Sequence, residues 1–409
     1  MTDAPTRGRI MPLALGPTRY ASALTTKTMP ALRYRARIAR RPRSVVAQPT
    51  SLCNLACLYC YLPHRHRRNH MPVPVAQALA QQITEITELY PGPPITLIWH
   101  AGEPMALGIR RFAELLEPFD RLLAAGQIEH ALQTNATLVT DSWCDLLARY
   151  RVRVGVSVDG PQELNGQRVD WAGRPAFRHI MRGIRRLQAR GIPFSVISVV
   201  GRETIGDPEV MLDFLAGLSP TSIGLNIEEE EGANTDRTPP SRGEALTFWR
   251  RVIAWNRRRP GTPIVRELDQ LGRYLQFART GTTPHWERVL ADPIPTVATT
   301  GDVVLLSPEL AGISSRTYND FVAGNITERP LSAILADAHH LPYVQEYLNG
   351  VDQCERSCDV YEFCRGSQAG NRYFEHGRFD TAETNYCRVS EQALVEALAE
   401  TAREETTAR

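Results

Sequence analysis

Three cysteines stand close together in the stretch SLCNLACLYCYL: Cys53, Cys57 and Cys60, spaced C-x3-C-x2-C. Three thiolates in one tight loop could bind a zinc ion and leave its fourth position open. They could also hold three irons of a 4Fe–4S cluster, whose fourth iron would lack a protein ligand and be free to bind another molecule. The spacing therefore predicts a metal centre with one open coordination position.

Four more cysteines form a second group near the C-terminus, spaced C-x3-C-x5-C-x22-C: Cys354, Cys358, Cys364 and Cys387. Four thiolates predict a closed site, and spacing alone leaves structural zinc and an iron–sulfur cluster both open. The eighth cysteine, Cys144, stands alone in the helical stretch DSWCDLLARY, and we interpret it as a small buried apolar residue.

The elements that must position the first cysteines alternate between strands and helices. Apolar, β-branched runs predict strands, and helical patterns of apolar residues follow them. The six predicted strands span residues 44–50, 95–101, 129–135, 153–159, 193–200 and 222–228. Six βα units predict an α/β fold, a partial (β/α)6 TIM-like barrel whose parallel sheet is open along one side.

The pattern changes after about residue 262. The sequence predicts a helix over 265–281, a hairpin turning at Gly301 and Asp302, one helix over 330–350 and a closing helix over 390–405. We therefore expect three parts: a basic N-terminal extension (1–43), the partial barrel (44–262) and a smaller C-terminal α+β domain with the late cysteines (263–409).

Charge is unevenly distributed along the chain. The net charge is +2, yet residues 1–50 hold ten Arg or Lys against Asp3 alone. Such an arm can be a solvated extension, a grip for an acidic peptide or a nucleic-acid tail. No basic motif interleaved with aromatics supports nucleic-acid binding, and no apolar run or secretory signal points to a membrane. We expect a cytoplasmic protein with neither partner, and we interpret the acidic run 228–231 as a solvated loop.

The C-x3-C-x2-C spacing, with Tyr59 before the last cysteine and a strand just ahead, resembles the signature of radical S-adenosylmethionine (SAM) enzymes. The resemblance implies that the first three cysteines hold a 4Fe–4S cluster and that SAM chelates its open iron. One electron from an external flavodoxin- or ferredoxin-type donor would split SAM into methionine and a 5′-deoxyadenosyl radical, which abstracts a substrate hydrogen. The protein would orient and shield this chemistry.

Other positions match the SAM-binding features of that family, most of them at ends of predicted strands. Gly102, Glu103 and Pro104 resemble the GEP motif, near which the SAM ammonium group is received. Arg168 is expected at the SAM carboxylate. The remaining expected contacts of SAM, the cluster or the substrate are Tyr59, Asn135, Ser157, Asp159 and Asn226. Carboxyl ends of parallel strands share one edge, so these residues should lie together.

The late cysteines resemble the C-terminal SPASM or twitch domain of radical SAM peptide-modifying enzymes, which carries auxiliary 4Fe–4S clusters. The full pattern has seven cysteines, but this chain lacks two near residues 296–306 and has Gln368 where another is usual. The resemblance thus implies one auxiliary cluster, for electron transfer or structural support. Its implied ligands are Cys354, Cys358, Cys364 and Cys387.

Stretches such as WHAGEP, LLSPEL and FVAGNI look most like maturases of ribosomally made peptides, in particular those that form cyclophanes. The resemblance implies a precursor peptide as substrate and a C–C bond from a side-chain carbon to an aromatic ring. Glu309 is a candidate for substrate contact or, more simply, a hairpin surface group. Open alternatives are thioether formation, epimerisation, sulfatase-type oxidation of Ser or Cys, small-molecule dehydrogenation and a non-enzymatic zinc-binding protein.

Overall fold

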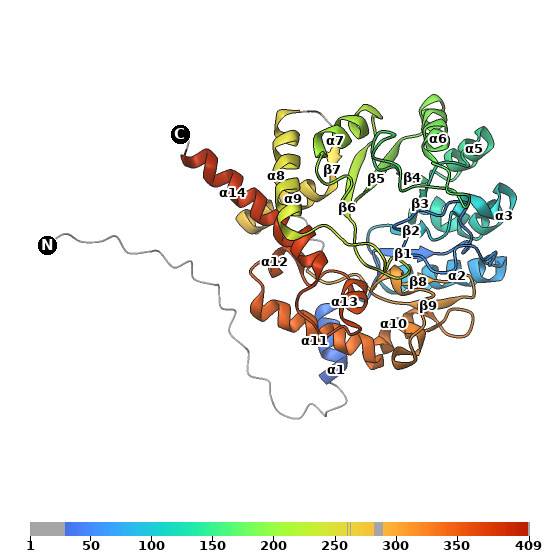
Figure 1. The fold of residues 1–409 in the computed structure, drawn as a ribbon. Helices are drawn as coiled ribbons and strands as arrows, with labels where there is room; N and C mark the ends of the chain where they lie inside the picture. Colours follow the sequence, from blue (N-terminus) through green and yellow to red (C-terminus); the bar gives the residue numbers. More distant parts are fainter. Residues whose placement is uncertain (1–28, 260, 262, 282–288, 408–409) are drawn as a thin grey trace.

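The computed structural model describes residues 29–259, 261, 263–281 and 289–407. These residues form one sheet of ten strands (Figure 1). The six predicted strands make its centre, parallel and in chain order: β1 (Ser44–Ala47), β2 (Ile95–Trp99), β3 (Ile128–Thr134), β4 (Arg153–Ser157), β5 (Phe194–Val200) and β6 (Ser222–Ile227). β1 and β6 are not neighbours in the described sheet, so the barrel is open and the predicted fold class is confirmed.

Several strands end earlier than predicted. β1 ends at Ala47 and β2 at Trp99, although the apolar pattern continues to residues 50 and 101. The cause is visible after β2, where Ala101 and Gly102 have φ angles of 78° and 58°, which no strand can accommodate. The same shortening of β3 and β4 places Asn135 and Asp159, both expected to bind SAM, in the loops that follow these strands.

Four short strands extend the sheet on both sides. β7 (Ile264–Val265) runs parallel to β6, and β8 (Thr296–Val297) runs parallel to β1. β9 (Asp302–Val304) and β10 (Gly324–Asn325) follow in antiparallel order. The predicted hairpin is therefore confirmed, with Gly301 at φ 90° in its turn. Because β8 pairs with β1, the C-terminal segment continues the sheet of the barrel.

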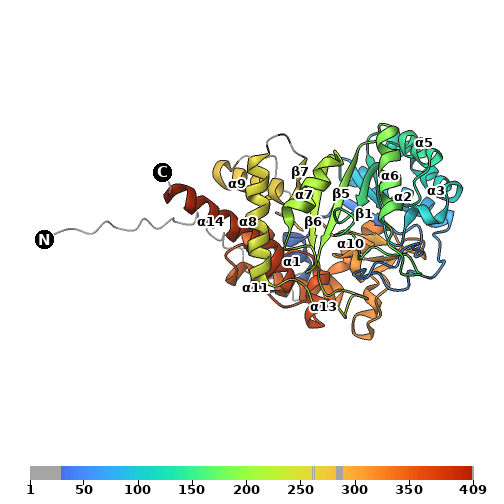
Figure 2. The same cartoon turned by 45° about the horizontal axis from the view of Figure 1, so that its top comes forward.

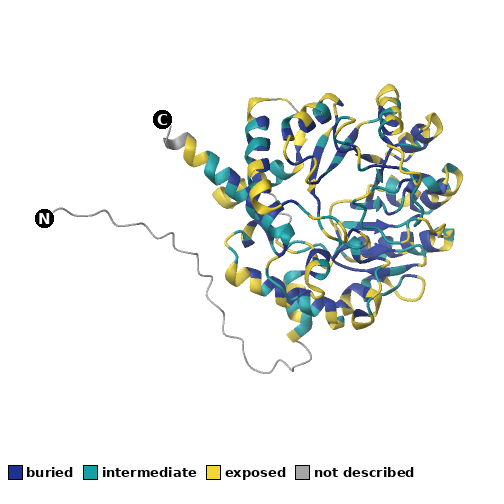
Figure 3. Cartoon of the chain, viewed as in Figure 1, coloured by how far each residue is buried: buried dark blue, intermediate teal, exposed yellow. Residues whose placement is uncertain are grey.

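Helices cover the outer face of the central strands (Figures 1 and 2). They are α2 (Val73–Leu89), α3 (Ile109–Leu116), α5 (Asp141–Arg149), α6 (Phe177–Ala189), α7 (Pro208–Gly217) and α8 (Arg242–Arg258). Their apolar faces and the β-branched strand residues form the buried interior, whereas the outer helix faces are exposed (Figure 3). Cys144 lies in this core, as predicted.

Two helices that the periodicity predicts as continuous are interrupted. The helical pattern over 111–126 breaks at Pro118 into α3, a 3-10 turn (Glu117–Phe119) and α4 (Asp120–Ala124). The predicted helix over 330–350 breaks before Pro342 into α10 (Leu331–Asp337), a 3-10 turn (Ala338–His340) and α11 (Pro342–Ser357). Proline has no N–H for the helical ladder and its ring crowds the preceding turn.

The C-terminal region packs directly on the barrel. Its further helices are α9 (Arg266–Thr280), α12 (Tyr361–Cys364), α13 (Ala369–His376), a π-helical turn (Cys387–Gln392) and α14 (Ala393–Thr407). α14, the predicted closing helix, lies along α8 (Figure 2). The indole N–H of Trp249 on α8 donates to the Val389 carbonyl of the π-helical turn at 2.8 Å, and Arg250 on α8 pairs with Glu400 on α14 at 3.1 Å.

Part of the predicted N-terminal extension is folded onto the C-terminal region. α1 (Met29–Arg37) places Arg33 2.6 Å and Arg37 3.1 Å from carboxylate oxygens of Asp352 on α11. These two arginines are therefore engaged by the chain itself. The rest of the predicted extension, residues 1–28, lies outside the described residues. None of the described helices combines the length and apolar content needed to cross a bilayer.

Candidate cofactor-binding site

The loop after β1 carries Cys53, Cys57 and Cys60 and lies against the end of β2. The amide of Glu103 donates to the Leu52 carbonyl at 2.8 Å. A Cβ at Gly102 would lie only 2.5 Å from that same carbonyl oxygen. Glycine is needed here both for this close approach and for its φ of +58°. The glycine of the predicted GEP motif is therefore required sterically, because the cysteine loop packs directly against it.

Replacing Gly102 with alanine is expected to displace the cysteine loop and to lower the iron content of anaerobically reconstituted protein. The left-handed φ alone costs about 1–2 kcal/mol for a residue with a Cβ, and the opposing backbone oxygen cannot rotate away. Gly108→Ala is the matched control, since Gly108 has φ +87° but nothing within 4 Å of its Cβ position. Equal iron contents in the two variants would contradict this interpretation.

Glu103 fastens the end of β2 to the end of β3. Its buried carboxylate accepts hydrogen bonds from Thr134 Oγ1 (2.7 Å), the Asn135 amide (2.8 Å) and the Met105 amide (3.1 Å). Burial raises the pKa of Glu103 to about 7, although these donors favour the ionised form. Pro104 follows directly and begins a short 3-10 helix (Pro104–Leu107).

Asn135 joins β3 to the cysteine loop. Its Nδ2 donates to Asn54 Oδ1 at 2.9 Å, and Asn54 Nδ2 donates to Thr137 Oγ1 at 2.8 Å. The Oδ1 atom of Asn135 in turn accepts from the Thr137 amide at 3.0 Å. Since Asn54 is next to Cys53, this network fixes the first cysteine from the side of β3.

Asp159 and Arg168 form a buried ion pair behind the loop. Arg168 donates to Asp159 through Nε (2.9 Å) and Nη2 (2.8 Å), and both side chains are less than a tenth exposed. Tyr59 donates its hydroxyl to Asp159 Oδ2 at 2.6 Å, and the Arg168 guanidinium lies 5.4 Å from the centre of the Tyr59 ring. Asp159 also accepts from the Val199 amide at 2.9 Å, so the pair links β4, β5 and the cysteine loop.

The three thiols lie half-buried near this pair. Burial raises the pKa of Cys57 to about 11, and the charge of Arg168 opposes that increase. Burial also raises the pKa of Cys53, and the charges of Glu103, Cys57 and Cys60 add to the effect. Soft sulfur donors beside a guanidinium fit an iron–sulfur cluster, whose thiolate ligands must be ionised.

Two of the expected SAM residues have other partners. Ser157 Oγ accepts from Gln133 Nε2 at 2.8 Å. Asn226 is exposed, and its Oδ1 accepts from Arg266 Nη2 on α9 at 2.7 Å. Among the described residues, no hydrogen bond joins either side chain to the cysteine loop. The structure therefore gathers five of the expected residues around the loop: Tyr59, Glu103, Asn135, Asp159 and Arg168. Ser157 and Asn226 instead bond to Gln133 and Arg266.

An acidic group, which we call the carboxylate network, consists of Glu229, Glu231 and Glu309. Asn371 on α13 joins the first two, because its Nδ2 donates to Glu229 Oε2 (2.6 Å) and Glu231 Oε1 (2.9 Å). Ser307 Oγ donates to Glu309 Oε2 at 2.5 Å. Burial and the charge of Glu309 raise the pKa of Glu231 to about 8. Interpreting run 228–231 as a solvated loop was wrong except for the exposed Glu230: Glu228 is buried and ion-paired with Arg237, and Glu229 and Glu231 pack against the C-terminal region.

Tyr61 connects the carboxylate network to the cysteine loop. The Ala233 amide donates to the Tyr61 carbonyl at 2.8 Å, and a Cβ on Gly232 would lie 2.3 Å from the same oxygen. Burial raises the pKa of Tyr61, and the charges of Glu309, Cys60 and Glu231 raise it further. The residues that directly follow Glu231 therefore pack against Tyr61, which directly follows the last cysteine of the loop.

The late cysteines lie around the C-terminal end of α11 and the segments that follow it. Cys354 and Cys364 are buried, and Cys358 and Cys387 are half-buried. Within the described part of the chain, no three His, Cys, Asp or Glu side chains converge closely enough to hold a single metal ion. A 4Fe–4S cluster distributes its ligands over separate irons, and sulfur is the donor it requires. Gln368, in place of a further cysteine, is exposed just before α13.

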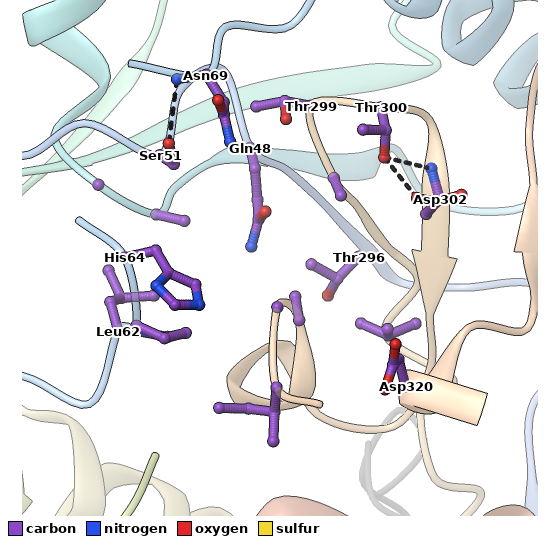
Figure 4. Close-up of a pocket in the computed structure, with 18 of the residues that line it drawn as sticks. Gln48, Ser51, Leu62, His64, Asn69, Thr296, Thr299, Thr300, Asp302 and Asp320 are labelled. Carbon is purple, nitrogen blue, oxygen red and sulfur yellow. Dashed lines mark hydrogen bonds between the residues drawn. The ribbon is translucent and has the colours of Figure 1, made fainter. Parts of the chain in front are cut away.

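A cavity of about 300 Å³ adjoins the cysteine loop on the side of the β8–β9 hairpin. Figure 4 shows Gln48, His64 and Thr296 around its open centre, with Asp320 at the hairpin side. Gly102 forms part of its wall, so the cavity reaches the edge of the cofactor site. Polar and apolar side chains both line it.

Sequence reasoning missed Asn54, Glu229, Glu231 and Asn371. Asn54 lies between the first two cysteines, and that position is the one local sign of its role. The two glutamates and Asn371 are about 140 residues apart in sequence. No local pattern indicates that they meet.

The open parallel barrel and its three-cysteine loop define a radical SAM protein, and sequence comparison agrees. Residues 48–215 match the radical SAM superfamily. An uncharacterized protein of Synechocystis is 31% identical over 362 residues, which cover 86% of this chain and 90% of that protein. The chain belongs to the radical SAM superfamily and is an enzyme. Membership implies one 4Fe–4S cluster and SAM as cofactors.

Named relatives include enzymes that mature sulfatases. A serine-type anaerobic sulfatase-maturating enzyme of Bacteroides thetaiotaomicron is 32% identical over 165 residues, covering 39% of this chain and 40% of that enzyme. The corresponding enzyme of Klebsiella aerogenes is 30% identical over 208 residues, covering 48% and 50%. The chain thus aligns with half or less of these enzymes.

Two solved structures share the fold over most of the chain. Native anSMEcpe with bound AdoMet and Cp18Cys peptide has a TM-score of 0.68 at 18% identity, covering 90% of this chain and 99% of that one. Streptococcus suis SuiB bound to precursor peptide SuiA has a TM-score of 0.62 at 16% identity, covering 85% and 76%. At these identities the likeness establishes the fold alone.

Proposed function

We propose that this enzyme is a maturase of a ribosomally made peptide and forms a C–C cross-link at an aromatic residue. The observation that carries the proposal is the position of the carboxylate network: Glu231 directly precedes Gly232 and Ala233, whose backbone contacts Tyr61, the residue after the last cysteine of the loop. In this proposal Cys53, Cys57 and Cys60 hold the cluster that binds SAM. The two cofactors together supply a 5′-deoxyadenosyl radical, which takes a hydrogen atom from a side-chain carbon.

The proposed reaction needs an acceptor for a proton as well as for an electron. Once the carbon radical has added to the ring, aromaticity returns only when the ring loses one proton and one electron. Glu309 would accept the proton, since an ionised carboxylate can act as a general base. Glu231, whose pKa is raised to about 8, would stay largely protonated beside it near neutral pH. An auxiliary cluster on Cys354, Cys358, Cys364 and Cys387 would accept the electron.

The remaining parts of the chain have proposed roles that follow from this chemistry. Residues 44–262 would bind SAM and generate the radical, and residues 263–409 would hold the auxiliary cluster. The open side of the barrel would admit the precursor peptide as an extended segment. Tyr59, Gly102, Glu103, Pro104, Asn135, Ser157, Asp159, Arg168 and Asn226 are the proposed residues that contact or position SAM. Reduction of the first cluster would come from a flavodoxin- or ferredoxin-type protein.

A second candidate function is the oxidation of a Ser or Cys side chain. It is favoured by the relatives whose names state serine-type sulfatase maturation. This reaction would use the same radical and would also release one proton and one electron. It differs in its product, which carries a new carbonyl group and no bond between residues.

Both candidates are tested by anaerobic turnover of a candidate precursor, encoded by a short reading frame beside the gene, with SAM and a reductant. Cross-linking and Ser oxidation both predict a peptide that has lost two hydrogen atoms. Cys oxidation would first give a thioaldehyde, which water hydrolyses to the aldehyde with release of hydrogen sulfide, so its product also carries oxygen in place of sulfur. Cross-linking predicts a product that does not react with a hydrazide probe and shows an aryl–alkyl carbon bond by NMR. A hydrazide-reactive aldehyde would overturn the cross-link and favour Ser or Cys oxidation.

Glu309→Gln is expected to reduce the yield of cross-linked peptide by about 100-fold, the usual effect of losing a general base. Formation of 5′-deoxyadenosine should persist, because Glu309 lies outside the residues that hold the cysteine loop. Glu230→Gln is the matched control, since Glu230 belongs to the same acidic run but is exposed. Equal product yields from both variants would exclude Glu309 as the proton acceptor.

A further inference from the structure

Arg372 on α13 is a buried arginine next to a late cysteine. It is 1% exposed, and its Nη2 atom lies 3.3 Å from Cys354 Sγ. The same Nη2 donates to the Gly366 carbonyl at 2.9 Å, and Nη1 donates to the Tyr347 carbonyl at 3.4 Å. The guanidinium lies 5.0 Å from the centre of the Tyr347 ring. Backbone oxygens, one ring and one sulfur thus surround it.

Within the part of the chain that the structure describes, Arg372 has no carboxylate partner. Among residues 29–259, 261, 263–281 and 289–407, its hydrogen-bond acceptors are two carbonyls and Cys354. A guanidinium is always charged, and burying it without an opposite charge is strongly unfavourable. Among the described residues, Cys354 is the hydrogen-bond partner of Arg372 that can carry a negative charge. An ionised sulfur at Cys354 would therefore stabilise the buried charge of Arg372.

The backbone is shaped around the guanidinium. A Cβ at Gly350 on α11 would lie 3.2 Å from Arg372 Nη1 and 2.6 Å from the Phe379 carbonyl oxygen. Gly366, two residues after Cys364, has φ +96° and accepts the hydrogen bond from Nη2. Gly350 thus leaves room for the guanidinium beside α11, and the Gly366 carbonyl holds it from the Cys364 loop. A side chain enclosed in this way is held in one position, as a tuning residue must be.

We propose that Arg372 supplies the counter-charge of the auxiliary cluster and raises its reduction potential through its N–H donor to Cys354 Sγ. This inference rests on the cluster ligands proposed above. A 4Fe–4S cluster with four thiolates is an anion, and reduction adds one more negative charge. A fixed cation and a hydrogen bond to a ligand sulfur stabilise the reduced form more than the oxidised form. The cluster thereby becomes a better acceptor for an electron leaving the substrate.

The experiment titrates the auxiliary cluster alone, in the full chain with Cys53, Cys57 and Cys60 all replaced by alanine. This parent is compared with its Arg372→Gln, Arg372→Lys and Arg365→Gln derivatives. Arg365 is the matched control, because it is adjacent to Cys364 but has its own carboxylate partner, Glu362. The measurements are iron and sulfide content and a potentiometric titration followed by EPR. No peptide substrate is present, so the outcome does not depend on the proposed reaction.

We expect Arg372→Gln to make reduction at least tenfold less favourable, a decrease of about 59 mV for one electron. Arg372→Lys should lie between parent and Gln variant, and Arg365→Gln should match the parent. If Arg372→Gln fails to load a cluster while Arg372→Lys loads normally, the counter-charge is equally supported. Two results would overturn the inference and leave Arg372 a structural residue. One is a midpoint potential of Arg372→Gln that lies within about 59 mV of the parent's. The other is loss of the cluster in both Arg372 variants. A parent without any cluster would overturn it too, by removing the auxiliary site.

Discussion

Cys57→Ala is expected to abolish formation of 5′-deoxyadenosine from SAM. The middle thiol of the loop lies beside Arg168, and its loss would leave two sulfurs to hold a cluster that must also keep one iron open for SAM. The measurement is chromatographic quantification of 5′-deoxyadenosine under anaerobic reducing conditions. Activity should fall to the level of the reaction without enzyme, the largest effect expected from any single substitution in this chain.

Two other cysteine variants make this result specific. Cys144→Ala removes a thiol that is buried in the core and belongs to neither group, so it should keep SAM cleavage. Cys364→Ala should also keep cleavage but lose the peptide product, because it removes a ligand of the proposed auxiliary cluster. Persistent 5′-deoxyadenosine formation in Cys57→Ala would show that the loop is not the site of SAM cleavage.

Asp159→Asn is expected to destabilise the folded protein by about 3–5 kcal/mol, the usual loss when one partner of a buried ion pair is removed. The substitution leaves the Arg168 charge buried without its carboxylate, and it weakens the bonds to Tyr59 and the Val199 amide. Urea unfolding of the protein measures the change in free energy. The same variant should bind SAM more weakly, since Tyr59 and Arg168 both lose their anchor beside Cys57.

An exposed ion pair provides the control for this variant. Glu129 and Arg153 join β3 to β4 at 2.7 Å, but their side chains are 47% and 65% exposed. Glu129→Ala should therefore change the free energy of unfolding by less than about 1 kcal/mol. If Asp159→Asn were as mild as Glu129→Ala, the buried pair would not be what holds β4, β5 and the cysteine loop together.

The sequence by itself determined the six central strands, the position of the cysteine loop and the class of chemistry. These features are local: a strand shows as a run of β-branched residues, and the three cysteines lie within eight positions of one another. Gly102 of the GEP stretch is likewise identified from local sequence. Its contact with the Leu52 carbonyl, which explains why a glycine is needed there, appears only in the structure. The prolines that break two helices, Pro118 and Pro342, are also visible in the sequence, but the apolar periodicity continues across them and predicted unbroken helices.

Only the tertiary structure decided which distant side chains meet. Asn371 reaches Glu229 and Glu231 because α13 packs against the loop after β6, and Arg33 reaches Asp352 because α1 packs against α11. Likewise, Arg372 was indistinguishable from a surface arginine until Gly350 and Gly366 were seen to enclose it next to Cys354. Hydrophobic periodicity specifies which face of each element is buried, but it carries no information about the partner of that face. The partner is fixed by the packing of the whole chain, and with it the charges that surround both cysteine groups.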